Sequence, residues 1–460
     1  MNILVWNCQG IVNRRTRHAL KMLIQKHQVN MVFLSETHCT ESQHQSLQRA
    51  LGFPNSMIEL KEQGAWLCSG MIQFKSQSEI PISSSLMSMS RDWKIVNGGL
   101  RVSMGIQIHE IYSDHCEEGL FARQEPNIEA HNAVLRTIQP RVTAEMNQAL
   151  LNPYTVEEVK EALFQMHPSK ASGPDGMSPF FYQKYWDLVD VQVSNAVISF
   201  LSTKDMPHDL NFTHVVLIPK EKEVQNMTQL RPIALCNVIY KIASKVLANR
   251  LKSFLSSIIS PEHGAFVPNR LIADNTFVAS ELAHYMNKLC RCQEGFMALK
   301  LDISKAYDRL EWDFLKKILL KFGFDPSWVD LIMHCLSTVR YSFLVNGAPR
   351  GYVTPHRGLR QGDPIFPYLF LLCAEGLSAL IADSMAKKQW QGLKVCDGAP
   401  EISHLLFAND SMLYASATQH NCEVNQVIRE ILNLYEDASV QQVNLEKSSV
   451  VFSGNVAYSA

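Results

Sequence analysis

Two aspartates stand at positions where carboxylate chemistry can take place. Asp302 ends the mainly apolar run 296–301, which predicts a strand, and Asp410 lies in the Asn409-Asp410 turn of a predicted hairpin. Carboxylates on adjacent strands can hold two divalent cations, which activate a hydroxyl group and stabilise a leaving pyrophosphate. Taken singly, each feature also has a simpler explanation. Asp302 would then only cap the next turn, and Asn409-Asp410 would only close a hairpin.

A loop with two glycines offers contacts to phosphates and bases. It runs from Arg357 to Pro364, and Gly358 and Gly362 permit a close approach of the backbone to a ligand. Arg360 and Gln361 supply side chains suited to phosphate and base edges. As an isolated motif the loop is weak, because Gly-Asp-Pro is also an ordinary turn.

A basic segment could bind a polyanion. Residues 211–270 contain eight basic and three acidic side chains, a net charge of +5, whereas the whole chain has 43 basic and 44 acidic residues and a net charge of −1. Lys220 and Arg231 lie near predicted strand ends, and a predicted helix over 238–258 carries further lysines. A basic surface must therefore be local. The alternative is that these charged side chains only form a solvent-exposed face of the protein.

The elements that position these residues follow from hydrophobic periodicity. Strands are predicted over 215–218, 296–302, 402–407 and 412–414. Helices are predicted over 156–166, 238–258 and 424–435, with one more through Phe314 that stops near Gly323. Thr155 and Glu158 have the spacing of a capping box at the start of the first helix. Strands and helices that follow one another in this irregular order along the chain predict an α+β fold.

Composition limits the class of protein. The chain has 460 residues, of which 46% are hydrophobic and 19% charged, so it suits a globular protein of two to four domains. It has no run of 18 apolar residues and no secretory signal, so we expect no membrane contact and an intracellular location. The eleven scattered cysteines suit free thiols in a reducing compartment.

The order of the motifs resembles the reverse transcriptase of non-LTR (LINE-type) retrotransposons, especially the plant branch. The block 301–312 contains Leu301-Asp302, and the block 404–411 contains Phe407-Ala408-Asn409-Asp410. The other matching blocks, in family order, are 170–177, 217–220, 230–235, 265–270 with 274–275, 358–364 with 367–370, and 443–448.

The resemblance implies the fingers and palm of a right-hand polymerase, with an antiparallel palm sheet and helices. Its activity would be RNA-directed DNA polymerisation by two-metal nucleotidyl transfer, with Mg²⁺ or Mn²⁺ and two ions expected. Asp302 and Asp410 match metal ligands, and Tyr307 matches a steric gate that rejects a ribose 2′-hydroxyl. Lys447 matches a lysine proposed to protonate the leaving pyrophosphate.

The resemblance also implies the partners. Lys220 and Arg231 match positions in the fingers that contact the phosphates of the incoming nucleotide. Gln361 and Gly362 match the loop that lies against template and nucleotide. The expected partners are an RNA template, a DNA primer and deoxynucleoside triphosphates, in the nucleus or the cytoplasm. The oligomeric state is left open.

Four positions depart from the family pattern. The family has Asp-Asp in the hairpin where this chain has Asn409-Asp410, so one metal ligand has lost its charge. Such a loss is worth ~3–5 kcal/mol, or ~10²–10⁴ in rate. Phe366 stands where the family usually has serine, and Asn269 and Val440 stand where it usually has glycine. These changes favour an impaired copy of the enzyme.

The first 75 residues resemble the start of the family's endonuclease, a partial α/β fragment of the exonuclease–endonuclease–phosphatase kind. Strands are predicted over 3–6 and 31–34. Asn7 belongs to the matching opening strand, and Glu36 matches a metal-binding glutamate, so both are vestigial endonuclease residues. The letters Ser113-Asp114-His115 match the nuclease's terminal catalytic pair either as a remnant or by chance.

These expectations give three regions. Residues 1–75 form a truncated endonuclease-like fragment, 76–150 form a linker or connector that begins with seven serines in residues 76–90, and 151–460 form the fingers and palm without a thumb. The main function is an RNA-directed DNA polymerase impaired by Asn409 and by truncation. One alternative is a catalytically inactive nucleic-acid-binding remnant. Another is a residual metal-dependent nuclease that uses Glu36.

Overall fold

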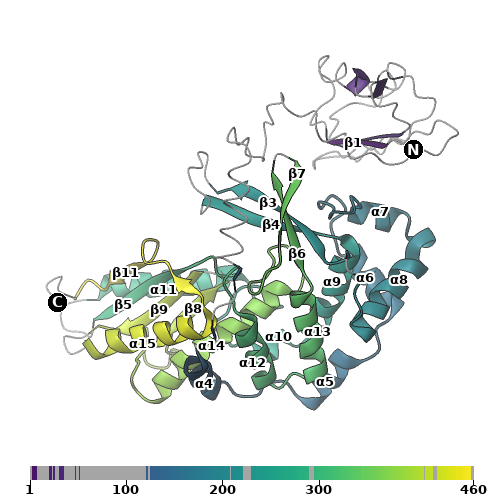
Figure 1. Cartoon of the computed structure of the whole chain (residues 1–460). Coiled ribbons are helices and arrows are strands. Elements are labelled where there is room, and N and C mark those ends of the chain that lie inside the picture. Colours follow the sequence, from purple (N-terminus) through teal and green to yellow (C-terminus); the bar gives the residue numbers. More distant parts are fainter. Residues whose placement is uncertain are drawn as a thin grey trace. The chain divides into compact units, whose positions relative to one another are not determined.

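The chain divides into two units, Met1–Lys94 and Ile95–Ala460, which we describe separately. The computed structural model describes residues 3–7, 20–22, 24–25, 31–35, 47, 51, 121–122, 125–207, 209–220, 229–289, 295–345, 347–408, 410–417 and 422–456 (Figure 1). In the first unit, β1 (Ile3–Asn7) pairs in parallel with β2 (Met31–Ser35), with Asn7 opposite Ser35. The two strands expected there are confirmed.

The sheet that carries both aspartates lies in the second unit. Its strands follow the order β10 (Gln442–Val443), β5 (Phe296–Ser304), β9 (Asp410–Ser416) and β8 (His404–Phe407), and β11 (Ser449–Phe452) also pairs with β5. The pairing of β5 with β9 and of β9 with β8 is antiparallel. The predicted strands at 296–302, 402–407 and 412–414 are present, with shifted ends.

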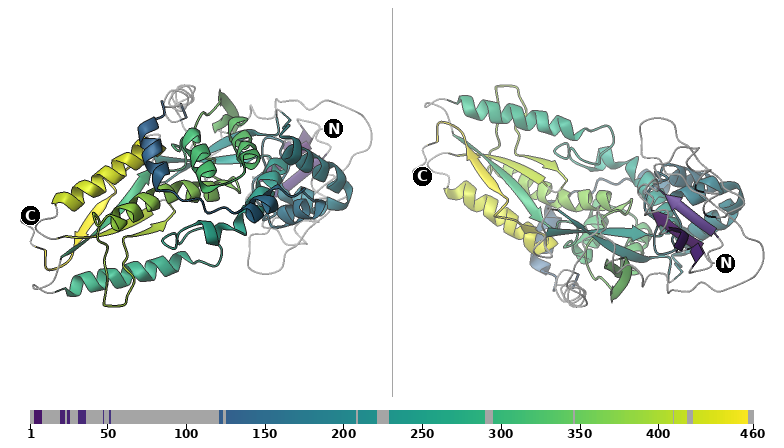
Figure 2. Two further views of the ribbon diagram at one scale, coloured as in Figure 1. Left: turned by 90° about the horizontal axis from the view of Figure 1, so that it is seen from below. Right: turned by 90° about the horizontal axis from the view of Figure 1, so that it is seen from above.

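Helices cover both faces of this sheet. Met297, Leu301 and Leu413 face the main core, to which α4 (Ile128–Thr137), α12 (Trp312–Phe322), α14 (Phe366–Ala386) and α15 (Cys422–Ser439) contribute. The alternate residues Ala298 and Tyr414 pack with α11 (Ile272–Lys288) on the other face. Figure 2 shows α11 and α15 on opposite sides of the strands. Alternation along each strand is the reason, because successive side chains point to opposite faces.

A second sheet of four strands forms the fingers-like part. Its order is β4 (Leu230–Cys236), β3 (Phe212–Pro219), β6 (Arg340–Val345) and β7 (Ala348–Val353). The β3–β4 and β6–β7 pairs are antiparallel, and β3–β6 is parallel. The helices near it in the chain are α6 (Val156–Phe164), α7 (Pro179–Lys184), α8 (Trp186–Thr203), α9 (Val238–Lys252), α10 (Leu255–Ile258) and α13 (Pro326–Ser337).

Helix ends follow local chemistry, with one correction. The Thr155 hydroxyl accepts a hydrogen bond from the Glu158 backbone N–H and the Glu158 side chain accepts one from Thr155, which confirms the capping box of α6. α12 ends at Gly323, whose φ of +96° only glycine adopts freely. The single helix predicted over 238–258 is wrong, because α9 stops at Lys252 and α10 starts at Leu255. The Ser253 hydroxyl donates to the Arg250 carbonyl where the first helix ends.

The connector expected over 76–150 contains two helices that its composition did not reveal. They are α4 and α5 (Ala144–Leu151), and Ala130, Val134 and Leu150 belong to the main core. The Asn127 side chain accepts a hydrogen bond from the Ala130 backbone N–H at the start of α4. Residues 128–151 therefore pack as part of the second unit.

α14 is the central helix of the main core. In the part of the chain that the structure describes, it is the one helix long and apolar enough to cross a membrane by length and composition. Of its most apolar stretch 72% is buried within the protein, so its hydrophobicity is used in packing.

Candidate functional site

Asp302 and Asp410 lie directly opposite each other on neighbouring strands. β5 and β9 are neighbouring strands (Figure 1), and in their antiparallel register the two aspartates are Cα partners. Side chains at such a pair point to the same face, with Cβ atoms about 4.5–5.5 Å apart. The expectation that the two carboxylates share one face is confirmed. One detail was wrong: β5 runs on to Ser304, so Asp302 is not its last residue.

The turn that carries Lys447 is tied to the backbone of Asp302. The Asn444 N–H donates to the Asp302 carbonyl at 2.7 Å, and the Asp302 N–H donates to the Ser448 hydroxyl at 3.3 Å. The Lys447 N–H donates to both oxygens of Asn444, at 3.2 and 3.3 Å. Lys447 is therefore exposed on a turn fixed to the strand that bears the first aspartate.

Lys220 and Arg231 reach the same place from the other sheet. They lie at adjoining ends of β3 and β4, where the Lys220 N–H donates to the Gln229 carbonyl at 2.9 Å. Burial lowers the pKa of Lys220, and the positive charges of Lys447 and Arg231 lower it further. Asp308 and Asp302 oppose this shift. The charges of Arg231, Lys447, Asp302 and Asp308 thus all act on Lys220.

Tyr307 lies in the turn that follows β5. Its ring stacks on Phe370 of α14, with centroids 4.6 Å apart, and its carbonyl accepts from the Leu359 N–H at 2.7 Å. The next residue, Asp308, is buried, and burial raises its pKa to about 6 against the lowering effect of nearby lysines and Arg309. Asp308 lay inside the motif but had no predicted role. The available signal in the sequence was an aspartate next to Arg309 and three residues after Lys305, inside the matching block 301–312.

The glycine loop joins this turn to the fingers-like sheet. The Gly358 N–H donates to the Leu310 carbonyl at 2.8 Å, and the Ala234 N–H of β4 donates to the Gln361 carbonyl at 3.0 Å. Gly362 has a φ of +111°, and a Cβ there would lie 3.2 Å from the Ala234 carbonyl oxygen. The loop is therefore bonded to the Tyr307 turn at Leu359 and to β4 at Gln361.

Comparison with known proteins decides the family. The family model described as "Reverse transcriptase (RNA-dependent DNA polymerase)" matches residues 218–458. The chain belongs to this family. All the predicted site residues from Lys220 to Lys447 fall inside the matched region, which confirms the resemblance to the reverse transcriptase domain of non-LTR retrotransposons.

Two relatives of this reverse transcriptase domain are much longer proteins. The chain is 27% identical over 317 residues to the uncharacterized 149 kDa protein of transposon TX1 from Xenopus laevis, covering 69% of the chain and 23% of that protein. It is 26% identical over 247 residues to the retrovirus-related Pol polyprotein of the type-2 retrotransposable element R2DM from Drosophila melanogaster, covering 54% and 22%. It thus spans less than a third of these relatives.

A further relative comes from a plant. An uncharacterized mitochondrial protein of Arabidopsis thaliana is 54% identical over 69 residues, covering 15% of the chain and 57% of that protein.

Arg360 of the reverse transcriptase domain was predicted to offer its side chain to phosphates or bases, but that side chain is used inside the protein. Its side chain is buried and donates to the Asn211 side-chain oxygen at 2.5 Å. It also forms an ion pair with Asp363 at 3.0 Å and lies over the Tyr240 ring, 4.2 Å from the centroid. The Asp363 carboxylate in turn accepts from the Ser244 hydroxyl. Arg360 therefore holds the loop to α9 and β3.

The predicted basic surface is smaller than its sequence indicated. Three of the eight basic residues serve the fold. Lys241 is buried and donates to the Ala171 carbonyl at 3.3 Å. Arg250 forms an ion pair with Glu158 at 2.7 Å, and Arg270 donates to the carbonyls of residues 256, 259, 260 and 263. Long basic side chains often satisfy carbonyls that end helices, because those oxygens lack partners within the helix.

Several predicted residues lie outside the described part of the chain. Asn409 and Glu36 are not described, nor is the segment 113–115. Asn7 is described only through the backbone pairing of β1. Within the described residues, no group of three or more His, Cys, Asp or Glu side chains could hold a metal ion together.

Proposed function

We propose that the chain is an RNA-directed DNA polymerase that acts through Asp302 and Asp410. The observation that carries the proposal is the register in which the two aspartates lie directly opposite each other. They are on the face of the sheet that packs with α11, not on the face that packs against the main core. Phosphoryl transfer needs charge stabilisation and alignment more than covalent chemistry. A pair of carboxylates flanked by cations from both sheets supplies both.

The donor set fits a hard divalent cation such as Mg²⁺ or Mn²⁺. Carboxylate oxygens are its preferred protein ligands, and it keeps water and substrate phosphates as the others. Asp302 and Asp410 would hold the ions, two in number as in the family, and Asn409 would add an uncharged oxygen. Bound there, the ions would lower the pKa of the attacking hydroxyl and neutralise the departing phosphates.

The surrounding side chains bind and orient the nucleotide in this proposal. Lys220 and Arg231 hold its phosphates, and Tyr307 packs under the sugar and excludes a 2′-hydroxyl. Gln361 and Gly362 lie along the template and the base. Lys447, on the turn tied to Asp302, supplies a proton to the leaving pyrophosphate. The support is that Asp302 and Asp410 are opposite each other and that the turn of Lys447 is bonded to the Asp302 backbone. The charges of Asp302, Arg231 and Lys447 also all act on Lys220.

The wider identity is also proposed. The domain would be the reverse transcriptase of a plant-type element, for which the similarity to the Arabidopsis protein is the support. Its partners would be an RNA template, a DNA primer and deoxynucleoside triphosphates, met in the nucleus or the cytoplasm. Residues 1–75 would be an endonuclease-like remnant, for which the parallel β1–β2 pair is the support. A residual nuclease using Glu36 stays an alternative for that segment.

Single-nucleotide incorporation tests the proposal. Primer–template in excess, with Mg²⁺ or Mn²⁺, should show ~10²-fold or more faster incorporation by Asn409→Asp than by the unaltered chain, because a third anionic ligand returns. Asp302→Asn made in the Asn409→Asp chain is the matched control and should abolish incorporation. If the unaltered chain is as active as Asn409→Asp, the metal assignment of Asn409 is wrong. If Asp302→Asn retains activity, the site itself is wrong.

A second candidate function is nucleic-acid binding without catalysis. It is favoured by the uncharged Asn409 in the hairpin and by the surviving cations Lys220, Arg231 and Lys447. Primer–template affinity should then persist without a divalent cation and weaken steeply with salt, because bound counterions are released. A restored Asn409→Asp chain that binds in this way but never incorporates a nucleotide would favour this candidate over the polymerase.

A further inference from the structure

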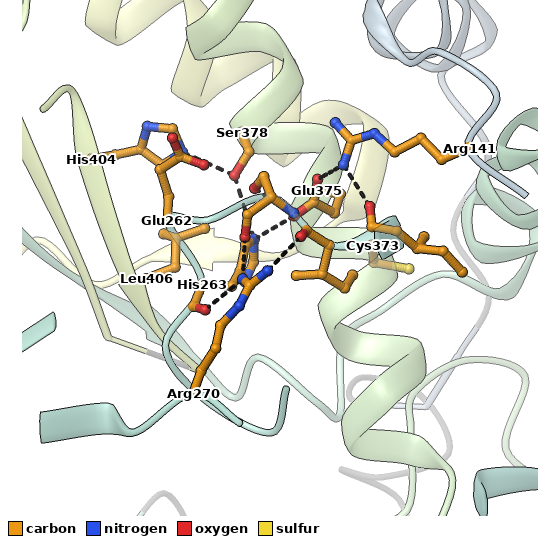
Figure 3. Close-up of polar contacts among 12 residues, drawn as sticks. Arg141, Glu262, His263, Arg270, Cys373, Glu375, Ser378, His404 and Leu406 are labelled. Carbon is orange, nitrogen blue, oxygen red and sulfur yellow. Dashed lines mark hydrogen bonds and ion pairs between the residues drawn. The ribbon is translucent and has the colours of Figure 1, made fainter. Parts of the chain in front are cut away.

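A buried polar network lies next to β8, the first strand of the β8–β9 hairpin. Its centre is Glu375 of α14, whose side chain is 1% exposed. Glu375 Oε2 accepts from Arg141 at 2.7 Å, and Glu375 Oε1 accepts from the N–H and hydroxyl of Ser260 at 2.9 and 2.7 Å. His263 Nε2 lies 3.1 Å from the same Oε1. Figure 3 shows Arg141 and His263 reaching Glu375 from opposite sides.

The charge of Glu375 is stabilised by these partners. Burial alone would raise its pKa, but the hydrogen bonds and charges of His263, Ser260 and Arg141 outweigh burial and lower the pKa to about 2. A buried carboxylate without such partners would cost several kcal/mol. The network therefore fixes the chain segment 260–263 on α14.

This segment is the outer neighbour of β8. The Leu406 N–H donates to the Glu262 carbonyl at 2.9 Å, and the Gly264 N–H donates to the Leu406 carbonyl at 3.0 Å. His263 and Leu406 form a parallel bridge, and the Asn275 side chain donates to the Glu262 and Leu406 carbonyls at 2.8 and 3.3 Å. The β8 edge of the sheet that contains β5, β9 and β8 is thus covered by a segment that Glu375 anchors.

A second tie joins the network to β8 through side chains. His404 Nε2 lies 3.0 Å from the Ser378 hydroxyl, which lies 3.4 Å from His263 Nε2. His404 Nδ1 lies 2.8 Å from the Ser403 hydroxyl. Figure 3 shows Ser378 between the two histidines. β8 is therefore held at residue 404 by side chains and at residue 406 by backbone.

β8 leads directly into the hairpin that presents Asp410. In the antiparallel register of β8 and β9, Phe407 is opposite Asp410, and Leu406 is opposite Ser411. We propose that Glu375 is a positioning residue, which sets the carboxylate of Asp410 against Asp302 by fixing the 260–264 segment along β8. This inference rests on the proposed function, in which the two carboxylates hold a cation. A metal ligand must be held within about 0.5 Å of its productive position by the residues behind it.

Two measurements on the full chain test this inference. Hydrogen exchange followed by mass spectrometry reports on the peptide 403–413, and Mn²⁺ titration followed by electron paramagnetic resonance reports on the carboxylate pair. Glu375→Gln should speed exchange in that peptide ~10-fold or more. It should also weaken Mn²⁺ binding ~10-fold, as second-layer substitutions commonly do. Ser260→Ala, which removes one donor to Glu375, should change the exchange rate and the Mn²⁺ affinity in the same directions but by smaller factors.

Glu158→Gln is the matched control, because it breaks the ion pair with Arg250 between α6 and α9 and does not touch β8. It should leave both readouts unchanged. Unaltered exchange in Glu375→Gln, or altered exchange with unaltered Mn²⁺ affinity, overturns the positioning role. Glu375→Asp, which keeps the charge, should recover part of the affinity, whereas a role in folding alone predicts no recovery of affinity.

The failure of the proposed function has a different signature. If neither the unaltered chain nor Asn409→Asp binds Mn²⁺, the metal site is refuted. Hydrogen exchange then still decides whether Glu375 holds β8, because that readout needs no metal.

Discussion

Replacing Gly358 by alanine should destabilise the domain much more than the same change at Gly398. Both glycines have left-handed backbones, with φ of +90° and +87°. A Cβ at Gly398 would meet nothing within 4 Å, whereas at Gly358 it would lie 2.5 Å from the Asp308 carbonyl oxygen and 3.0 Å from its carbon. The two changes therefore share the conformational cost, and they differ in the overlap with Asp308.

The magnitude follows from these two contributions. At Gly398, a positive φ costs about 1–2 kcal/mol, and the lower entropy of the unfolded alanine chain offsets about 0.4–1 kcal/mol of it. At Gly358, the overlapping atom belongs to a backbone held by the Asp308 N–H to Lys305 carbonyl bond of 2.9 Å, so it cannot move aside without breaking that turn. Overpacking of this kind adds about 1–3 kcal/mol.

Urea unfolding followed by circular dichroism measures both changes. Gly358→Ala should lower the free energy of unfolding by about 2–4 kcal/mol and Gly398→Ala by about 1 kcal/mol or less. The turn that overlaps the new methyl group also carries Tyr307, so folded Gly358→Ala should lose nucleotide incorporation in the Asn409→Asp chain. Equal destabilisation at the two sites would refute the proposed close packing of the loop on the turn.

Three further predictions concern stability and binding. Val440→Gly should be neutral or stabilising, because Val440 has a φ of +61°, whereas Val443→Gly, in a strand, should destabilise by about 1–2 kcal/mol in the same urea assay. The free energy of unfolding should fall by up to about 1.4 kcal/mol per pH unit between pH 6 and 4 on account of His404, and His404→Gln should remove that part of the slope. Burial and the charge of His263 lower the pKa of His404 to about 3, so the unfolded state takes up the proton first. Arg360→Met should cost about 3–5 kcal/mol, since Asp363 loses its buried cationic partner, and should leave primer–template affinity unchanged in a filter-binding assay.

Local signals in the sequence predicted much of the palm. Mainly apolar runs marked β5, β8 and β9, and the short Asn409-Asp410 connection indicated the hairpin of β8 and β9. Because the hairpin lies next to the strand that contains Asp302, few registers between β5 and β9 are possible. In the observed register Asp302 is opposite Asp410. The capping box of α6 was predicted for the same reason, since all its atoms lie within one turn.

The partners of long basic side chains were not predictable in this way. Arg360 bonds to Asn211, and Arg250 to Glu158, across 149 and 92 residues of chain. Composition alone counts such residues as surface charge, although each side chain donates to a carbonyl or carboxylate inside the fold. Glu375 did carry a signal, because it is the one charged side chain in the apolar run 366–382. A carboxylate in a buried helix must be paired.

The departures from the family pattern act on different properties of the molecule. Asn269 and Val440, where the family usually has glycine, both have left-handed φ, of +62° and +61°. The backbone there keeps the conformation that glycine would favour, so these substitutions cost stability and leave the fold intact. Asn409 instead removes charge from the proposed cation site. Asn269→Gly with Val440→Gly should therefore raise the urea midpoint without changing nucleotide incorporation, and Asn409→Asp should change incorporation without raising the midpoint. If the glycine substitutions restored incorporation by themselves, backbone strain and not the lost ligand would be what limits incorporation.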